Sequence, residues 1–222
     1  ANPHVLIEGC IIACHAIRAK HAFIYIRGEI THVARRVNQA IADAYAAGIL
    51  GNGIDVVLHV GAGAYICGEE TALIESIEGK KGQPRFKPPF PASYGVFGKP
   101  TNVNNTESYA SIPWILQHGG QAFQDLGVPN SGGTKLFSVS GHVEKPGNYE
   151  VNMGMPFVDL LEMAGGIWKG RKLKAVIPGG PSTAVMPASA ILGATMDYEG
   201  LSKAGSSLGA GSMIVMDDTT CM

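Results

Sequence analysis

The sequence has no surplus of positive charge and no long apolar run, and these two absences exclude broad classes of function. Its 17 Lys and Arg residues are balanced by 18 Asp and Glu residues, giving a formal net charge of -1. Proteins that bind the phosphate backbone of nucleic acids normally carry a basic surplus, so nucleic acid is excluded as the main partner. A transmembrane helix needs roughly 20 consecutive apolar residues, and no stretch of this sequence approaches that length. We therefore expect a globular protein that reaches a membrane only if a partner tethers it.

The sequence also lacks the dense cysteine pattern of a secreted disulfide framework, since 4 cysteines in 222 residues are an ordinary number, and a reducing compartment fits better. Cys10 and Cys14 stand one helical turn apart in an apolar, helix-like segment. This spacing predicts that both pack in the core as small apolar residues. A metal site formed by the two cysteines and His15 is the alternative, and we assign no metal ligand in this chain. No Ser, His and Asp set at a meaningful spacing supports a hydrolase.

The first half of the chain alternates between helix-like and strand-like segments. Apolar periodicity predicts, in order, a helix at 5–20, a strand at 22–27, a helix at 31–47, a strand at 54–60 and a helix at 69–77. Such alternation is typical of a three-layer α/β unit with a mainly parallel sheet. Ligands of such sheets bind outside the carboxyl ends of the strands.

The second half has a different pattern, and it follows a Gly- and Pro-containing segment, 128–133, that we interpret as a linker. Strands are predicted at 136–141, 149–151, 175–178 and 213–216, with a turn at 144–148 and a short helix at 156–163. The sequence therefore predicts two domains, of which the first ends near residue 127.

Three glycines, Gly61, Gly63 and Gly68, lie between the predicted strand at 54–60 and the helix that opens at Glu69. Small residues at this point allow backbone N–H groups to approach a flat or anionic ligand closely. The spacing matches neither the dinucleotide fingerprint G-x-G-x-x-G nor a Walker A loop. A tight turn without a ligand is therefore the alternative.

The segment that follows, residues 79–101, is rich in Pro and Gly and too long to be a simple connector, which favours a functional loop. It carries basic but no acidic side chains up to residue 99: Lys80, Lys81, Arg85, Lys87 and Lys99. This local charge suits the pyrophosphate of a dinucleotide, and a solvated basic loop is the alternative.

Three motifs occur in a fixed order: G-A-G-A-Y-I-C-G-E-E-T-A-L at 61–73, P-R-F-K-P-P-F-P at 84–91 and T-N-V-N-N-T-E at 101–107. Together they resemble the flavoprotein, NADH-binding subunit of respiratory NADH:quinone oxidoreductase (complex I). The resemblance extends from Leu6 to Met216. Diaphorase subunits of NAD-linked hydrogenases and formate dehydrogenases are close relatives of that family.

The resemblance implies a Rossmann-like FMN- and NADH-binding domain at 1–127 and a β-grasp domain, of the soluble-ligand-binding type, at 128–218. Residues 219–222 would then begin the helical domain that binds a [4Fe-4S] cluster in the full-length protein. The family's N-terminal glycine loop, G-R-G-G-A-G-F-P, precedes the part of the pattern seen here. We therefore expect this chain to be a fragment that binds FMN weakly or not at all by itself.

The implied activity is hydride transfer from NADH to FMN, followed by single-electron transfer to iron–sulfur clusters and on toward quinone. The implied partners are a thioredoxin-like [2Fe-2S] subunit and the other peripheral-arm subunits of complex I, on the cytoplasmic side of a bacterial inner membrane. A hydrogenase or formate dehydrogenase diaphorase subunit is the alternative within the same chemistry. A non-catalytic ligand-binding scaffold is the alternative from another class.

The resemblance also implies which residues hold the cofactors, while leaving the protein a positioning role only. Tyr65, Glu69 and Glu70 would lie beside FMN and NADH, and Phe90 would stack on the adenine. The full predicted set is Gly61, Gly63, Tyr65, Gly68, Glu69, Glu70, Phe90, Val103, Asn104, Asn105 and Ser108. At position 108 the family usually has Thr, and Ser keeps the hydroxyl.

Each of these residues also has a plain structural alternative. Glu69 and Glu70 could favour the positive end of a helix, and Phe90 could be a core aromatic. Asn104 and Asn105, which the resemblance assigns to the phosphate and ribityl side of the flavin, could form a capping turn. For Glu29 and His59 we predict structural roles.

Overall fold

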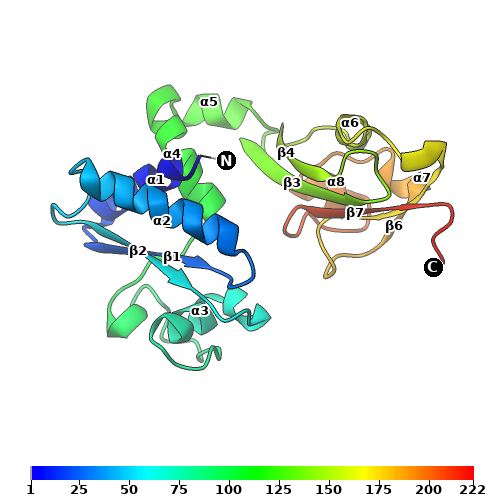
Figure 1. Cartoon of the computed structure of the whole chain (residues 1–222). Helices are drawn as coiled ribbons and strands as arrows, with labels where there is room; N and C mark the ends of the chain where they lie inside the picture. Colours follow the sequence, from blue (N-terminus) through cyan, green and yellow to red (C-terminus); the bar gives the residue numbers. More distant parts are fainter. Residues whose placement is uncertain (1) are drawn as a thin grey trace. The chain divides into compact units, whose positions relative to one another are not determined.

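The computed structural model describes residues 2–222, which fold into two compact units that divide between residues 117 and 118. Figure 1 shows the course of the chain through both units. No helix in the described part of the chain is long and apolar enough to cross a membrane.

The first unit has a two-stranded parallel sheet between two layers of helices (Figure 1). Helices α1 and α2 lie on one face of the sheet and α3 lies on the other. The predicted three-layer α/β architecture is thus confirmed. Its elements are α1 (Pro3–Ile17), β1 (His21–Ile26), α2 (Thr31–Ala46), β2 (Asp55–Val60), a 3₁₀ helix (Tyr65–Gly68), α3 (Glu70–Ile77), a 3₁₀ turn (Val96–Gly98) and α4 (Thr106–His118).

The two strands pair in register from His21 opposite Asp55 to Ile26 opposite Val60, so both end at the same edge of the sheet. The pairing continues one step further, because the N–H of Gly61 donates to the carbonyl of Ile26 at 2.7 Å. Helix α2 supplies the crossover that a parallel pair requires. This topology places the segments that follow β1 and β2 next to each other.

Apolar residues of α1, α2 and both strands form the core of the first unit, including Ile7, Ile24 and Val56. Cys10 and Cys14 are both buried at 5% exposure, as the packing interpretation predicts. Burial and the nearby Cys14 raise the pKa of the Cys10 thiol to about 11. The thiol therefore stays protonated and apolar in its packing.

The second unit is built on a five-stranded mixed sheet in the order β4-β3-β7-β5-β6, in which only β3 and β7 are parallel. Its core includes Phe137 and Phe157, both fully buried, each worth roughly 1.5–3 kcal/mol of transfer free energy. The elements are α5 (Gly120–Asp125), β3 (Thr134–Gly141), β4 (Gly147–Asn152), α6 (Phe157–Met163), a 3₁₀ turn (Trp168–Gly170), β5 (Leu173–Ile177), β6 (Met186–Pro187), α7 (Ala188–Ile191), α8 (Tyr198–Lys203) and β7 (Ser212–Asp217).

A buried carboxylate closes the last strand of the second unit. Asp217 has no exposed surface, and its oxygens accept hydrogen bonds from Trp168 Nε1 at 2.8 Å, Arg171 NH1 at 3.0 Å and Thr219 Oγ1 at 2.6 Å. Burial opposes its ionisation, but these donors outweigh it and hold the pKa of Asp217 well below its usual range. The carboxylate therefore joins the end of β7 to the turn at Trp168.

Several elements differ from those expected from the sequence. Helix α1 ends at Ile17, because Arg18 takes the left-handed conformation, φ 58°, and ends the helix short of residue 20. Helices α4 and α5 were not predicted, and α4 contains Pro113, which disguises its helical pattern. Residues 128–133, interpreted as a linker, form a tight turn inside the second unit, where Val128 and Ser131 pair through a β-bridge.

Candidate functional site

The glycine turn that follows β2 packs directly against the end of β1. A Cβ on Gly28 would lie 2.4 Å from the carbonyl oxygen of Gly61, and a Cβ on Gly61 would lie 2.1 Å from Tyr25 Oη. Gly63 has φ +85°, a conformation that other residues adopt at a cost. Backbone packing, and not only ligand access, thus requires small residues at the carboxyl ends of both strands.

The Tyr25 side chain packs against Gly61 of this turn and links it to α3. Its hydroxyl lies 3.0 Å from Ser76 Oγ in α3, and its ring stacks on His59 with centroids 5.3 Å apart. Glu29 pairs with Arg27 at 2.9 Å at the end of β1. His59 and Glu29 therefore each make packing or ionic contacts within the first unit.

Glu69 begins α3 and caps it. Its Oε2 accepts hydrogen bonds from the N–H groups of Thr71 and Ala72, both at 2.9 Å, and from the Thr71 hydroxyl. Burial opposes its ionisation, but these donors and Lys87 outweigh it and lower the pKa of Glu69 to about 2. Oε2 of Glu69 thus caps the first turn of α3, while Oε1 lies 3.1 Å from Lys87 Nζ.

Lys87 joins Glu69 and Glu70 and was not among the predicted site residues. Its Nζ also lies 2.5 Å from Oε1 of Glu70, and hydrogen bonds to Glu70 and then Glu69 raise the pKa of the lysine. All three side chains are partly exposed, so the charges remain accessible to a ligand. The sequence places Lys87 among five basic residues of this loop, and nothing in the sequence distinguishes it from the other four.

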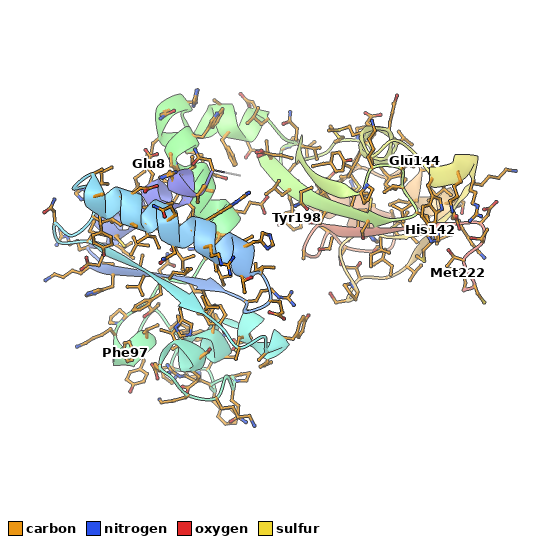
Figure 2. All side chains as sticks on the ribbon, viewed as in Figure 1. Glu8, Phe97, His142, Glu144, Tyr198 and Met222 are labelled. Carbon is orange, nitrogen blue, oxygen red and sulfur yellow. The ribbon has the colours of Figure 1, made fainter. Side chains whose placement is uncertain are left out.

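Aromatic side chains stand out from the same region. Tyr65 is 94% exposed and Phe90 is 57% exposed, which excludes an ordinary core position for Phe90. Phe86, which lies outside the predicted site residues, is 96% exposed, and Phe97, labelled in Figure 2, is also exposed. Exposed aromatic faces are suited to stacking on a flat base.

Val103, Asn104, Asn105 and Ser108 gather at the start of α4. The carbonyl of Asn105 accepts the N–H of Tyr109 at 3.3 Å, which places this residue at the helix N-terminus. Asn104, Asn105 and Ser108 are exposed, and Val103 is half-buried. The N-terminus of a helix attracts anions, so this group has the donors that a phosphate requires.

The loop at 79–101 is fastened to α3 by ion pairs. Arg85 pairs with both Glu75 and Glu78, at 2.8 Å for NH2 to Glu78 Oε1, and Lys80 lies 2.9 Å from Glu78 Oε2. Glu78 Oε1 also accepts the N–H of Phe97 at 2.8 Å. Burial opposes ionisation of Glu78, but Lys80, Arg85 and the Phe97 N–H outweigh it and lower its pKa to about 2.

This shift predicts an acid-dependent stability. Because the folded pKa lies below the ordinary value of 4.5, ionised Glu78 stabilises the fold above about pH 4.5, and this contribution is lost as the pH falls toward about 2. Glu78→Gln should lower the Tm at neutral pH, and it should make the decrease of Tm between about pH 4.5 and about pH 2 smaller than in the parent, as measured by circular dichroism. The slope should not vanish, since Glu69 titrates in the same window. An unchanged acid slope would contradict the assignment.

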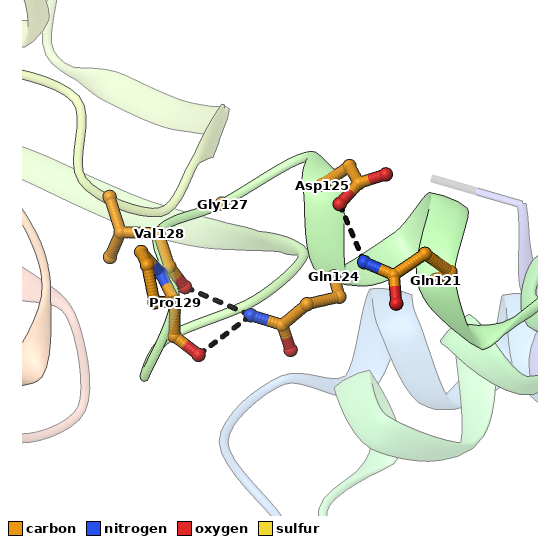
Figure 3. Close-up of a pocket in the computed structure, with 6 residues that line it drawn as sticks. All are labelled: Gln121, Gln124, Asp125, Gly127, Val128 and Pro129. Carbon is orange, nitrogen blue, oxygen red and sulfur yellow. Dashed lines mark hydrogen bonds between the residues drawn. The ribbon is translucent and has the colours of Figure 1, made fainter.

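A pocket of about 430 Å³ in the second unit is lined by residues between 121 and 129, none of which is a predicted site residue (Figure 3). Gln124 spans it, with Nε2 donating to the carbonyls of Val128 at 3.0 Å and Pro129 at 2.9 Å, and Gln121 bonds Asp125 at 2.8 Å. These bonds brace the turn after α5. Among residues 2–222, no group of His, Cys, Asp and Glu side chains is arranged to hold a metal ion.

The parallel sheet between helical layers, with the glycine turn at the carboxyl ends of its strands, places the first unit among three-layer α/β proteins. Residues 1–114 match the family described as the Nuo51 FMN-binding domain, and residues 135–202 match the SLBB domain. Since the first match covers half of the chain, the chain belongs to the Nuo51 FMN-binding domain family. The second match accords with the predicted β-grasp fold.

Curated relatives are similar along the whole chain. The F subunit of the NADH-quinone oxidoreductase of Mycobacterium bovis is 51% identical over 100% of this chain and 51% of its own length. The corresponding proteins of Streptomyces coelicolor and Rickettsia bellii, which carry the same name, are each 52% identical, over 51% and 55% of their lengths. This chain thus spans about half the length of the curated relatives it matches.

Among solved structures, an NAD⁺-reducing [NiFe]-hydrogenase in its H₂-reduced state contains a similar chain. It superposes with a TM-score of 0.86 at 36% identity, covering 97% of this chain and 36% of the hydrogenase chain. The similarity supports the fold of both units.

Proposed function

We propose that this chain is the FMN- and NADH-binding part, with the adjoining β-grasp domain, of the flavoprotein subunit of an NADH:quinone oxidoreductase. The observation that carries the proposal is the ion pair between Glu70 and Lys87, which comes after the glycine turn, together with the exposed ring of Phe90 three residues after Lys87. Family membership and the NADH-quinone oxidoreductase relatives support it.

The residues present fit FMN. The glycine turn leaves backbone accessible at the carboxyl edge of the sheet, and the start of α4 offers amides and a hydroxyl for a phosphate. The proposed contacts are Gly61, Gly63, Tyr65, Gly68 and Glu69 on the ring side, and Val103, Asn104, Asn105 and Ser108 on the ribityl and phosphate side. When bound, FMN accepts a hydride from NADH and passes electrons on one at a time.

The chain's own residues would bind and orient the dinucleotide. Phe90 offers a face for the adenine, Lys87 offers a cation for the pyrophosphate, and Glu70 offers acceptors for the ribose hydroxyls. Fixing the nicotinamide against the flavin in a reactive geometry lowers the entropic part of the barrier, and no side chain needs to react.

For the whole protein we propose residues 1–127 as the flavin domain, 128–218 as the β-grasp domain and 219–222 as the start of a domain with a [4Fe-4S] cluster. The proposed boundary lies after α5, whereas the two compact units divide between residues 117 and 118. The proposed partners are a thioredoxin-like [2Fe-2S] subunit and other peripheral-arm subunits, on the cytoplasmic side of a bacterial inner membrane. A diaphorase subunit is the second candidate, because the similar solved chain belongs to an NAD⁺-reducing hydrogenase. Purifying the whole protein with its associated subunits tests the proposal: FMN and a quinone-reducing assembly support it, and a hydrogenase assembly favours the second candidate.

Asn104→Ala combined with Asn105→Ala should weaken FMN binding in the whole protein by roughly tenfold or more, since each lost hydrogen bond contributes about 0.5–1.5 kcal/mol. Flavin content per subunit after dialysis measures this. Asn52→Ala, whose side chain bonds the carbonyl of Gly48 in a remote loop, is the matched control and should retain its flavin. Full flavin retention in the double variant would assign both asparagines to the helix start alone.

A further inference from the structure

Arg85 holds both ends of the segment that carries Lys87 and Phe90. Its N–H donates to Thr71 Oγ1 in α3 at 2.8 Å, and its guanidinium NH1 donates to the carbonyl of Gly95 at 3.2 Å. These two contacts of Arg85, which we call the clasp, join α3 to a residue 10 positions further along the chain. The two side chains proposed to bind the dinucleotide lie between these fixed points.

The clasp is itself anchored to α3 by two carboxylates. Arg85 pairs with Glu75 and Glu78, and the exposed fractions of the three side chains are 20%, 17% and 7%. Charge-assisted hydrogen bonds of this kind are stronger and more directional than neutral ones, and the planar guanidinium fixes their geometry. Glu78 also receives the N–H of Phe97, so the same carboxylate holds the far end of the loop.

The Thr71 hydroxyl extends this link to Glu69 and Lys87. The hydroxyl accepts a hydrogen bond from the N–H of Arg85 and donates one to Oε2 of Glu69. The other carboxylate oxygen of Glu69, Oε1, lies 3.1 Å from Lys87 Nζ. The loop is therefore fastened to the same first turn of α3 that carries Glu69 and Glu70.

We infer that Arg85 is a positioning residue for dinucleotide binding: with Glu75 and Glu78 it holds the loop at 85–95 so that Phe90 faces the adenine. The inference rests on the proposed function. Arg85 itself is turned toward α3 and Gly95, so it acts through the loop and not by touching the dinucleotide.

The test is a double-mutant cycle in the whole protein with its associated subunits, measuring KM for NADH, kcat and flavin content. Arg85→Ala should raise KM roughly tenfold, because small misplacements of a binding group are costly, with kcat and flavin changed less than about twofold. In a Phe90→Ala background, Arg85→Ala should raise KM by no more than about twofold, because the face it positions is already gone.

Two further variants separate positioning from charge and from folding. Arg85→Lys keeps the charge but loses the planar fork, and should raise KM by an intermediate amount. Lys80→Ala removes a cation from the same two carboxylates without reaching Gly95, and should leave KM within about twofold of the parent.

Two outcomes would overturn the inference while leaving the proposed function intact: an unchanged KM in Arg85→Ala, or effects of Arg85→Ala and Phe90→Ala that multiply. An unchanged KM in Phe90→Ala would overturn the inference and would also remove Phe90 from the observations that carry the proposed function. Flavin loss in both Arg85→Ala and Arg85→Lys would also overturn the inference, since the network would then support the whole unit. A parent protein that holds no flavin would overturn both the inference and the proposed function.

Discussion

Replacing Glu70 by Gln in the whole protein should raise kcat/KM for NADPH relative to NADH by about tenfold or more, corresponding to about 1.4 kcal/mol. Two negative charges about 4 Å apart repel by about 4 kcal/mol at an effective dielectric near 20, an upper guide that solvent and salt reduce. A carboxylate near the adenosine ribose therefore accepts hydrogen bonds from hydroxyls but repels a 2′-phosphate.

The ion pair between Glu70 and Lys87 adds to this expectation. Lys87 Nζ lies 2.5 Å from Glu70 Oε1, so the substitution both removes an anion and frees a cation to face the extra phosphate. Glu29→Gln is the matched control: it removes the same charge from a carboxylate at the end of β1 and should leave the NADPH to NADH ratio within about twofold. If Glu70→Gln keeps its flavin and the parent's preference for NADH, another group sets that preference.

Phe90→Ala should raise KM for NADH by a factor of roughly 5 to 150, since a base stacked on an aromatic face contributes about 1–3 kcal/mol. The side chain is 57% exposed, so its removal leaves little cavity and should not lower the Tm by more than a few degrees. Flavin content should stay the same. Steady-state kinetics and flavin extraction on the same preparation measure both.

Phe86→Ala provides the comparison for this prediction. Phe86 is more exposed than Phe90 and lies on the same loop, before Lys87. It should change KM for NADH by less than about threefold, a surface effect only. Equal effects of the two substitutions would indicate a general disturbance of the loop and would remove the specific role of Phe90.

Local patterns were enough to predict most of the first unit. Alternating and helical apolar periodicity located β2 at Asp55–Val60 and α2 at Thr31–Ala46 to within a residue or two, because both elements bury one face against the same core. Cys10 and Cys14 were assigned to that core for the same reason. The short helices of the second unit, α7 and α8, carry too few turns to show a period.

The ionic contacts of the candidate site could not be predicted from the sequence. Glu69 is predicted as a ligand contact, with a place at the positive end of a helix as the alternative, and the structure shows that it caps α3 directly after a 3₁₀ helix. Lys87 lies 17 positions from Glu70, and only the folded loop brings the two together. The clasp between Arg85 and Gly95 likewise depends on the path of a proline-rich loop that has no periodic pattern.

We propose that this chain positions FMN and NADH for hydride transfer in the whole protein. The most direct test of this proposal is to mix the whole flavoprotein with NADH anaerobically and follow the visible flavin absorbance. We expect stoichiometric bleaching by NADH in the parent and in Phe86→Ala, with Phe90→Ala needing a higher NADH concentration for the same rate of bleaching. A protein that holds FMN but is not bleached by NADH would contradict it.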